Sequence, residues 1–265
     1  MLYVNQKIQN LIDKIDYKQL YVVADFDRTI TKGKSKTSWA ILADSKLLPD
    51  DYINDRHKLY NYYRPIEIDE FENEIIKQQA MKDWYHKHIE LFIKYQLKEE
   101  LIEKASNDFR IMEFRKGAKE FSQFLYENHI PLIIISAGIG NFIKAFLEQN
   151  NCNYDNIYIS SNMIVFKDGI AVGVGNNIIH SLNKNEVSLP GPIKRKISNR
   201  SQILLLGDQI SDIKMVNASK RENTIRIGFL TEETKHNTTH FCKSFDIICD
   251  DDSTYYDIIH EIFKI

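Results

Sequence analysis

The sequence has little net charge and no long hydrophobic run. Its 265 residues include 35 Lys and Arg and 37 Asp and Glu, which gives a formal net charge of −2. Without a surplus of positive charge, no global field draws the chain to a nucleic-acid polymer or to a membrane surface. No apolar segment of the sequence is long enough to cross a bilayer. Any affinity for an anion must therefore be local.

Cysteine is also scarce. The chain has three cysteines, Cys152, Cys242 and Cys249, and an odd number without a CxxC pair indicates neither a disulfide framework nor a zinc site. We expect these residues to act as small apolar side chains. Residues 1–16 mix polar and apolar side chains, which excludes the continuous apolar segment of a signal peptide. We therefore expect a reduced protein in the cytoplasm.

The sequence does contain several continuous apolar runs, each typical of a buried strand. The clearest runs cover residues 20–24, 130–135 and 203–206, and helical patterns separate them. Continuous apolar strands that alternate with helices predict an α/β fold, in which helices cover both faces of a parallel sheet. Asp168-Gly169 predicts the turn of a hairpin between residues 163–166 and 170–174.

One long helical stretch interrupts this alternation directly after the first strand. Residues 38–108 are rich in aromatic side chains, and Pro49 and Pro65 mark expected boundaries between helices. We expect three to five helices and little sheet in this stretch, and we interpret it as an inserted cap domain. The predicted boundaries are 34–111 for the cap, with 1–33 and 112–265 forming the core.

Polar residues of particular chemical types end three of the apolar runs. Asp25 and Asp27 follow the first, Ser136 ends the second, and Gly207-Asp208 closes the third. Ligands bind outside the carboxyl ends of the strands in open parallel sheets, so we expect these residues to meet. Buried carboxylates need a cation because desolvating a charged Asp is costly. Carboxylates commonly bind Mg²⁺ together with a substrate phosphate, so phosphate chemistry is the first hypothesis.

Two further residues fit this site, and together the set resembles a known superfamily. Asp212 lies four positions after Asp208, where a loop can turn it toward a metal, and Lys184 can supply counter-charge. The full set resembles the four motifs of the haloacid-dehalogenase-like phosphohydrolases, in the same order: Asp25-Phe26-Asp27-Arg28-Thr29, Ser136, Lys184, and Gly207-Asp208-Gln209-Ile210-Ser211-Asp212. The resemblance implies a Rossmann-like core with a cap domain.

The resemblance also implies a role for each acidic residue. Asp25 would be the nucleophile that forms an aspartyl-phosphate, and Asp27 would protonate the leaving oxygen and then activate water. Mg²⁺ would be held by the Asp25 carboxylate, the Asp27 main-chain carbonyl and Asp208, with Asp212 supporting these ligands. A carboxylate is a weak nucleophile toward a phosphate dianion, so Mg²⁺ and Lys184 must first neutralise charge.

The phosphate itself requires hydrogen-bond donors. The Ser136 hydroxyl and the main-chain N–H groups of Ala137 and Gly138 can bind its oxygens, helped by the helix expected just beyond them. Taken singly, Ser136 is better explained as a helix cap and Lys184 as a surface residue. The four motifs in order favour the functional interpretation of both.

A closer resemblance is to the cytosolic pyrimidine 5′-nucleotidases. It rests on segments spread over most of the chain: Ser136-Ala137-Gly138-Ile139-Gly140, Ser161-Asn162-Met163, His180-Ser181-Leu182-Asn183-Lys184, Leu205-Leu206-Gly207-Asp208, and Met81-Lys82-Asp83-Trp84-Tyr85-His86-Lys87 in the cap. It implies that Asp83 and Trp84 lie near a nucleobase, with Trp84 as a stacking face. The chain departs from the family at Asp83, usually Glu, and at Ser211, usually Gly, while Arg28 has no assigned role.

We therefore expect a Mg²⁺-dependent phosphomonoesterase that acts on a small metabolite, with pyrimidine nucleoside 5′-monophosphates leading. Phosphatases of phosphoserine or of a sugar phosphate, a phosphotransferase and a silent scaffold of the same fold remain alternatives. Trp84 has an equally good explanation as part of the cap core. His86 and His88 point to different faces of a helix, so we expect surface or substrate-mouth positions for them and no metal pair.

Overall fold

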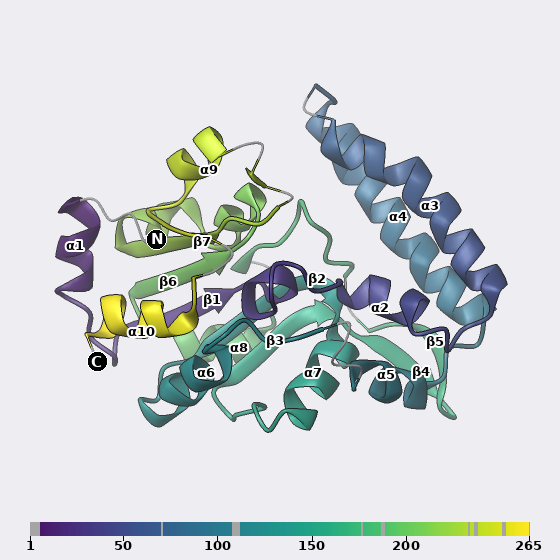
Figure 1. The fold of residues 1–265 in the computed structure, drawn as a ribbon, viewed down its shortest axis with the longest axis horizontal. Helices are drawn as coiled ribbons and strands as arrows, with labels where there is room; N and C mark the ends of the chain where they lie inside the picture. The colour runs from purple at the N-terminus through teal and green to yellow at the C-terminus, as the bar shows by residue number, and fades with distance from the viewer. Residues whose placement is uncertain are drawn as a thin grey trace.

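The computed structural model describes residues 6–69, 71–107, 112–175, 177–186, 189–232, 234–235, 238–250 and 253–264. Its centre is a sheet of six parallel strands in the order β3-β2-β1-β6-β7-β8 (Figure 1). In chain order the strands are β1 (Leu20–Ala24), β2 (Leu132–Ile139), β3 (Ile157–Asn162), β6 (Gln202–Gly207), β7 (Thr224–Phe229) and β8 (Ile247–Cys249). Their parallel pairing confirms the predicted fold class.

Alternate side chains of β1 enter two different hydrophobic cores. Leu20, Val22 and Ala24 pack into the larger core, and Tyr21 and Val23 pack into a smaller one on the opposite face. The larger core is covered by α1 (Gln6–Ile12), α6 (Ala118–Glu127), α7 (Gly140–Gln149) and α10 (Tyr255–Phe263), and the smaller one by α8 (Gly191–Ile197) and the 3₁₀ helix η3 (Ile210–Met215). Burial on both faces explains why the strand is continuously apolar.

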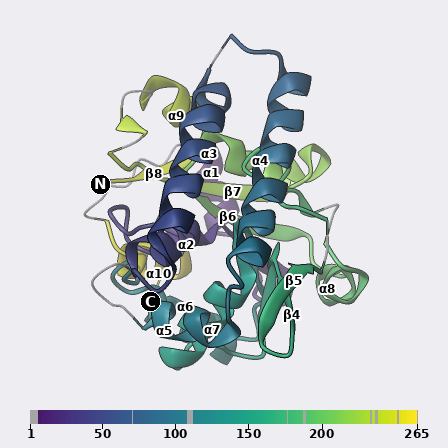
Figure 2. The ribbon, with the colours of Figure 1, turned by 90° about the vertical axis from the view of Figure 1, so that its right-hand side faces the viewer.

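The helical insertion follows β1, as predicted. It contains α2 (Ser38–Asp44), α3 (Asp50–Ile68), α4 (Glu74–Lys94) and α5 (Glu99–Ser106) among the described residues of 34–107. Residues of α2 and α5 join the larger core, as do Tyr52 of α3 and Phe92 of α4. Most of α3 and α4 extends away from the sheet as a pair (Figures 1 and 2). Pro65 lies inside α3 and does not separate two helices, because α3 ends within one turn of it and few bonds are lost.

A short two-stranded contact joins the ends of the insertion to the core. Thr31 and Phe114 form an isolated antiparallel bridge. On either side of it, Lys32 N donates to Glu113 O at 2.9 Å and Arg115 N donates to Ile30 O at 2.9 Å. The chain therefore leaves and re-enters the core through one neck.

The predicted hairpin is present as β4 (Ile164–Lys167) and β5 (Ile170–Val174). Asp168 and Gly169 form its turn with φ of 51° and 75°, the left-handed conformation that such two-residue turns require. The hairpin also supports the insertion, since Ala171 N donates to Leu97 O and Glu99 N donates to Gly169 O.

The remaining described elements are the 3₁₀ helix η4 (Ala218–Asn223) and α9 (Thr238–Ser244). Cys152 and Cys249 are buried, as expected of small core side chains, whereas Cys242 on α9 is exposed. Within the described ranges, no helix combines the length and the apolar character that a membrane crossing requires.

The helix pair is fixed to the core by stacked aromatic rings. Phe92 on α4 is fully buried and stacks on Trp39 of α2 at 5.7 Å and on Tyr52 of α3 at 6.0 Å between ring centroids. We predict that Phe92→Ala lowers the free energy of unfolding by about 3–5 kcal/mol, because it removes this ring and leaves a cavity. Denaturant unfolding followed by circular dichroism measures the loss.

The matched control is Phe71→Ala, because Phe71 is 98% exposed between α3 and α4. We expect it to change the free energy of unfolding by less than about 0.5 kcal/mol. Equal unfolding midpoints for the two variants would contradict the role given to the aromatic stack.

Candidate active site

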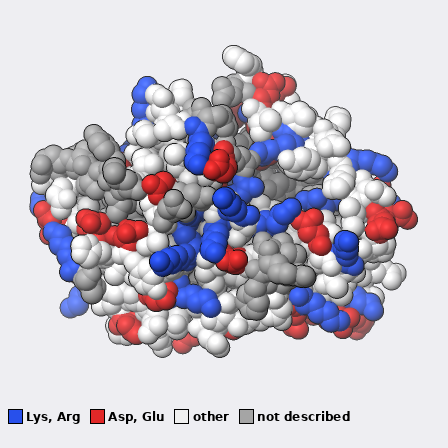
Figure 3. Space-filling view, viewed as in Figure 1, with Lys and Arg blue, Asp and Glu red and all other residues white. Residues whose placement is uncertain are grey.

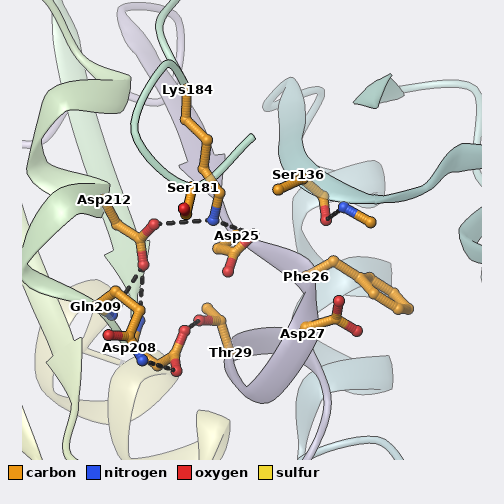
Figure 4. Close-up of polar contacts among 12 residues, drawn as sticks. Asp25, Phe26, Asp27, Thr29, Ser136, Ser181, Lys184, Asp208, Gln209 and Asp212 are labelled. Carbon is orange, nitrogen blue, oxygen red and sulfur yellow. Dashed lines mark hydrogen bonds and ion pairs between the residues drawn. The ribbon is translucent and has the colours of Figure 1, made fainter. Parts of the chain in front are cut away.

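Three neighbouring strands bring the motif residues together at their carboxyl ends (Figure 4). Asp25 follows the central β1, Ser136 lies in β2 on one side, and Asp208 follows β6 on the other. All three side chains are buried. The polar residues at these three strand ends, which the sequence predicts to meet, therefore do lie together.

Lys184 lies between two of the carboxylates. Its Nζ is 2.9 Å from Asp25 Oδ1 and 3.0 Å from Asp212 Oδ1. Burial alone would lower the pKa of Lys184, but the charges of Asp212 and Asp25 outweigh burial and raise it. Lys184 therefore stays protonated and supplies the positive charge that the sequence required.

Asp25, Asp208 and Asp212 form a buried acidic cluster. Each offers a carboxylate oxygen, and these atoms lie within 4.8 Å of one another. Burial, followed by the charge of Asp212 and then of Asp25, raises the pKa of Asp208 to about 8. Burial also raises the pKa of Asp25 to about 6, partly against the effect of Lys184. The raised pKa values indicate that Lys184 alone does not balance the three carboxylates when all of them are charged.

The donor set of this cluster fits a hard divalent cation. Asp212 is already engaged, because its Oδ1 contacts Lys184 and its Oδ2 accepts from the N–H groups of Asp208 at 3.1 Å and Gln209 at 2.9 Å. Asp25 contacts Lys184, and Asp208 accepts from Thr29 Oγ1 at 3.5 Å and from Gln209 Nε2 at 3.1 Å. Both carboxylates take part in the acidic cluster, and their oxygens are the type of ligand that Mg²⁺ prefers. Asp212 is placed to orient Asp208 and Lys184, which is a supporting position.

A sharp turn after β1 sends Asp27 to the other side of the site. In the turn η1 (Phe26–Ile30), Asp27 is extended and Arg28 is left-handed with φ of 64°. Asp27 Oδ1 accepts from Ser38 N at 3.2 Å, and Figure 4 shows its carboxylate away from Asp208 and Asp212. Burial, followed by the charge of Asp25, raises the pKa of Asp27 to about 7. The two aspartates thus have different surroundings.

Arg115 stabilises this turn through hydrogen bonds to its main-chain carbonyl groups. Its guanidinium is buried and donates to Arg28 O at 2.7 Å and to Thr29 O at 3.2 Å. It also lies 4.2 Å above the ring of Phe229, and Tyr255 Oη donates to Thr29 O at 3.3 Å. A left-handed non-glycine residue is strained, so these contacts stabilise the conformation that separates Asp25 from Asp27.

Asn162 joins the Ser136 loop to the Lys184 loop. Its Nδ2 donates to Ala137 O at 2.9 Å, Gly138 O at 3.2 Å and Ile179 O at 2.8 Å. Its Oδ1 accepts from Ile179 N at 2.9 Å. One fully buried amide at the end of β3 therefore sets the spacing between two loops of the site.

The segment after Ser136 passes close to Asp27. Gly138 N donates to Ser136 Oγ at 3.0 Å, so this N–H orients the serine hydroxyl. A Cβ at Gly138 would lie 2.4 Å from Ser38 Oγ and 3.3 Å from Asp27 Oδ2. Only glycine lets the backbone approach both side chains, which explains the residue type at this position.

A cavity of about 780 Å³ opens above these residues. Its floor includes Asp25, Asp27, Ser136, Ala137, Gly138, Lys184 and Asp208, and its walls include Arg28 and side chains from α2, α3 and α4. A cavity of this size holds a small organic ligand. Figure 3 shows Lys and Arg side chains gathered near the middle of the face that Figure 1 presents.

The predicted cap residues separate into two groups. Trp84 is buried and lines the cavity, where it also stacks on Tyr63 at 5.9 Å. Asp83 is exposed, accepts from Gln79 Nε2 at 2.8 Å and does not line the cavity. His86 is exposed, whereas His88 is buried and lines the cavity. The helical spacing predicted different faces for the two histidines, and the structure places them so.

Sequence reasoning assigned no role to three residues that shape the site. Asn162 is the last residue of β3, so it lies at a strand end like the other site residues and could have been found by the same reasoning. Arg115 lies in a polar stretch with no pattern of its own, and only the fold brings it to η1. Arg56 on α3 lines the cavity although nothing in its surrounding sequence indicates this.

A family model described as Pyrimidine 5′-nucleotidase (UMPH-1) matches residues 25–265. The chain belongs to this family. Membership identifies it as a phosphoric monoester hydrolase of the 5′-nucleotidase type. The match begins at Asp25 and includes every residue of the site described above.

The chain matches most of the length of its curated relatives. The 7-methylguanosine phosphate-specific 5′-nucleotidase of Mus musculus is 31% identical over 254 residues, which cover 93% of this chain and 84% of the mouse protein. The protein of the same name from Drosophila melanogaster is 31% identical over 246 residues, which cover 89% of this chain and 77% of the fly protein.

Solved structures confirm the fold. A crystal structure of cytosolic 5′-nucleotidase IIIB bound to cytidine superposes with a TM-score of 0.88 at 28% identity, covering 99% of this chain and 92% of that one. Substrate-bound phosphoserine phosphatase superposes with a TM-score of 0.57 at 19% identity, covering 92% of this chain and 98% of that one. The second similarity concerns the fold alone.

We predict that Asn162→Asp lowers kcat/KM for phosphomonoester hydrolysis by about 10²-fold, because a carboxylate cannot donate to three carbonyl groups and the two loops move apart. Steady-state kinetics with a generic aryl phosphate measure the effect, and denaturant unfolding of the same variant measures the accompanying loss of stability.

Asn156→Asp is the matched control at the other end of the same strand. Asn156 Nδ2 also donates to a main-chain carbonyl, that of Ile130 at 2.7 Å, but it lies outside the site. We expect this variant to lose stability and to keep its activity. If both variants lose activity in proportion to stability, Asn162 has a structural role only.

Proposed function

We propose that the chain is a Mg²⁺-dependent phosphatase of nucleoside 5′-monophosphates that works through an aspartyl-phosphate on Asp25. The observation that carries this proposal is the arrangement at the sheet edge: Asp25 lies between Lys184 and Asp208, and Asp27 is turned toward the cavity beside Ser38. One carboxylate is placed to attack beside a cation, and the other is placed to exchange protons.

The metal site is built from the acidic cluster. The Asp25 carboxylate, Asp208 and the main-chain carbonyl of Asp27 would hold Mg²⁺, with Asp212 orienting the set through its bonds to Asp208 N and Lys184. When bound, Mg²⁺ supplies positive charge that offsets the charge of the substrate phosphate. All other steps are carried out by side chains and main-chain groups of the protein.

The phosphate group of the substrate lies over Asp25. The Lys184 ammonium, the Ser136 hydroxyl and the N–H groups of Ala137 and Gly138 bind its oxygens, for which Gly138 N exchanges its bond to Ser136. These donors balance the charge on the phosphoryl group as it is transferred. The same contacts hold phosphorus in line with the attacking carboxylate oxygen.

The reaction then has two displacements. In the first, an Asp25 oxygen forms a bond to phosphorus, the bond from phosphorus to the 5′ oxygen breaks, and Asp27 gives its proton to that oxygen. In the second, Asp27 takes a proton from water, the water oxygen bonds to phosphorus, and the Asp25 carboxylate leaves. Inorganic phosphate and the nucleoside are the products, and both aspartates return to their starting states.

The walls of the cavity carry the substrate proposal. Trp39, Tyr60, Trp84, Tyr85 and His88 give it an aromatic lining, which suits a flat base. We propose Trp84 as a base contact, whereas the exposed position of Asp83 does not support the base contact that the resemblance implies. A pyrimidine base is favoured by the family description, and the cytidine in cytosolic 5′-nucleotidase IIIB agrees with it.

We also propose that the protein acts in the cytoplasm. The support is the name of its structural relative, a cytosolic 5′-nucleotidase, together with the cysteine content noted above. Its partners would then be small phosphorylated metabolites.

The test is a phosphate-release screen with nucleoside monophosphates, sugar phosphates and phosphoserine in the presence of Mg²⁺. We predict that UMP and CMP are hydrolysed and that a chelator abolishes their hydrolysis. Asp25→Asn should lower kcat by about 10³-fold or more, because it removes the nucleophile.

Asp168→Asn is the control, because it makes the same chemical change on the exposed hairpin turn, where asparagine also accepts a left-handed backbone. It should retain full activity. An Asp25→Asn variant as active as the wild type would overturn the mechanism. A strong response to phosphoserine with none to nucleotides would overturn the substrate and leave the phosphatase chemistry in place.

A further inference from the structure

One face of α3 lies along the cavity. Arg56, Tyr60 and Arg64 follow one another at four-residue spacing, which places them on one side of the helix, and all three line the cavity. Trp84 and His88 have the same spacing on α4 and line the same cavity. The two helices therefore present five polar or aromatic side chains to whatever ligand lies above Asp25.

Three buried nitrogen atoms on these residues have no hydrogen-bond partner within the described part of the chain. They are Arg56 Nε, Trp84 Nε1 and His88 Nε2. Trp84 is 8% exposed and His88 is 7% exposed, so water cannot freely serve them. Folded proteins rarely leave buried polar atoms unpaired, and the nitrogens of Arg and Trp can only donate. A ligand that brings acceptors would satisfy them.

The nearby carboxylate of α3 is already engaged. Glu67 Oε1 accepts from Ser181 Oγ at 2.6 Å, and Glu67 Oε2 accepts from Arg64 Nη1 at 2.5 Å. Asp55 pairs with Lys58 and Lys94, both at 2.8 Å. Among the described residues, no ion pair joins Arg56 to a carboxylate. At the wall of the cavity, Arg56 therefore has no carboxylate partner among the residues that the structure describes.

The positive charge of Arg56 affects the protonation of His88, which lies on the facing helix. Burial, followed by the positive charge of Arg56, lowers the pKa of His88 to about 3, so His88 is neutral at physiological pH. Another cation brought into this enclosed space would meet the same repulsion, because charges interact more strongly there than in bulk water. A neutral group with exposed oxygen atoms would meet attraction.

We infer that Arg56 is a specificity-determining residue, which favours a neutral base that presents carbonyl oxygens and disfavours the cationic ring of 7-methylguanine. The inference rests on the proposed function, since it concerns the base of a nucleoside monophosphate. Uracil has two carbonyl oxygens that can accept from Arg56 and Trp84. The chain would therefore differ in base preference from relatives named for 7-methylguanosine phosphate.

The experiment compares kcat/KM for UMP and for 7-methylguanosine 5′-monophosphate in four proteins. These are the wild type, Arg56→Gln, Arg56→Lys and the control Lys58→Gln, which removes one positive charge from α3 at an exposed position outside the cavity. An aryl phosphate, which has no base, reports the chemistry at Asp25 in each protein.

We expect the wild type to prefer UMP by about tenfold or more, and Arg56→Gln to reduce this preference by about tenfold, since a charged hydrogen bond and a like-charge repulsion are both lost. Arg56→Lys keeps the charge and should keep the exclusion of 7-methylguanine while weakening UMP. Lys58→Gln should match the wild type. Aryl phosphate hydrolysis by Lys58→Gln should equal that of the wild type, and the nucleotide rates of each Arg56 variant are compared with the aryl phosphate rate of the same protein.

The failure of this inference differs from the failure of the proposed function. If nucleotides are hydrolysed and Arg56→Gln leaves the preference unchanged, or if the wild type prefers the 7-methylguanine nucleotide, Arg56 does not set specificity and the nucleotidase proposal stands. If neither nucleotide is hydrolysed while the aryl phosphate is, the proposed substrate class falls and the inference falls with it.

Discussion

The buried charge at the end of β1 is the constraint on which the rest of the site depends. Asp25 is buried at the carboxyl end of a central strand, where carboxylates are tolerated only with cations beside them. Lys184 provides one cation, and it reaches Asp25 from a loop that Asn162 and Asp212 hold in place. The need for a second cation accounts for the metal site, because Asp208 and Asp212 bring the cluster to three carboxylates and Lys184 supplies only one positive charge. The buried carboxylates at the end of β1 thus determine where both the metal cation and the substrate phosphate bind.

The sheet and the residues at its carboxyl edge were predictable because a buried strand is visible in the sequence as a continuous run of apolar residues. A strand covered on both faces is continuously apolar, as in residues 20–24 and 203–206, so the polar residue that ends it is visible. Helix limits in the insertion were less predictable. Pro65 lies inside α3, and α4 is capped by Asn73, whose Oδ1 accepts from Ile75 N at 2.8 Å. Several other polar residues near Asn73 could cap a helix equally well, so the sequence alone does not show at which residue the helix begins.

The roles of Arg115, Asn162 and Arg56 were not predictable for a different reason. Each depends on a residue far away in the chain: Arg115 on the carbonyl of Arg28, Asn162 on that of Ala137, and Arg56 on the packing of α3 against α4. Conversely, Asp83 and Trp84 are adjacent in sequence and were grouped by resemblance, yet a helix rotates neighbours by about 100°. One of them faces the cavity and the other faces solvent.

The neck formed by Thr31, Phe114 and Arg115 has a consequence for how such proteins diversify. The bridge and the Arg115 contacts close the chain at the base of the insertion, across a separation of 87 residues between Arg115 and Arg28. The entropy cost of closing a loop grows only slowly with the length of the loop. The insertion can therefore lengthen, shorten or be replaced with little effect on the turn η1. The catalytic residues of the core can then stay the same while the insertion, which lines the cavity, changes the choice of ligand.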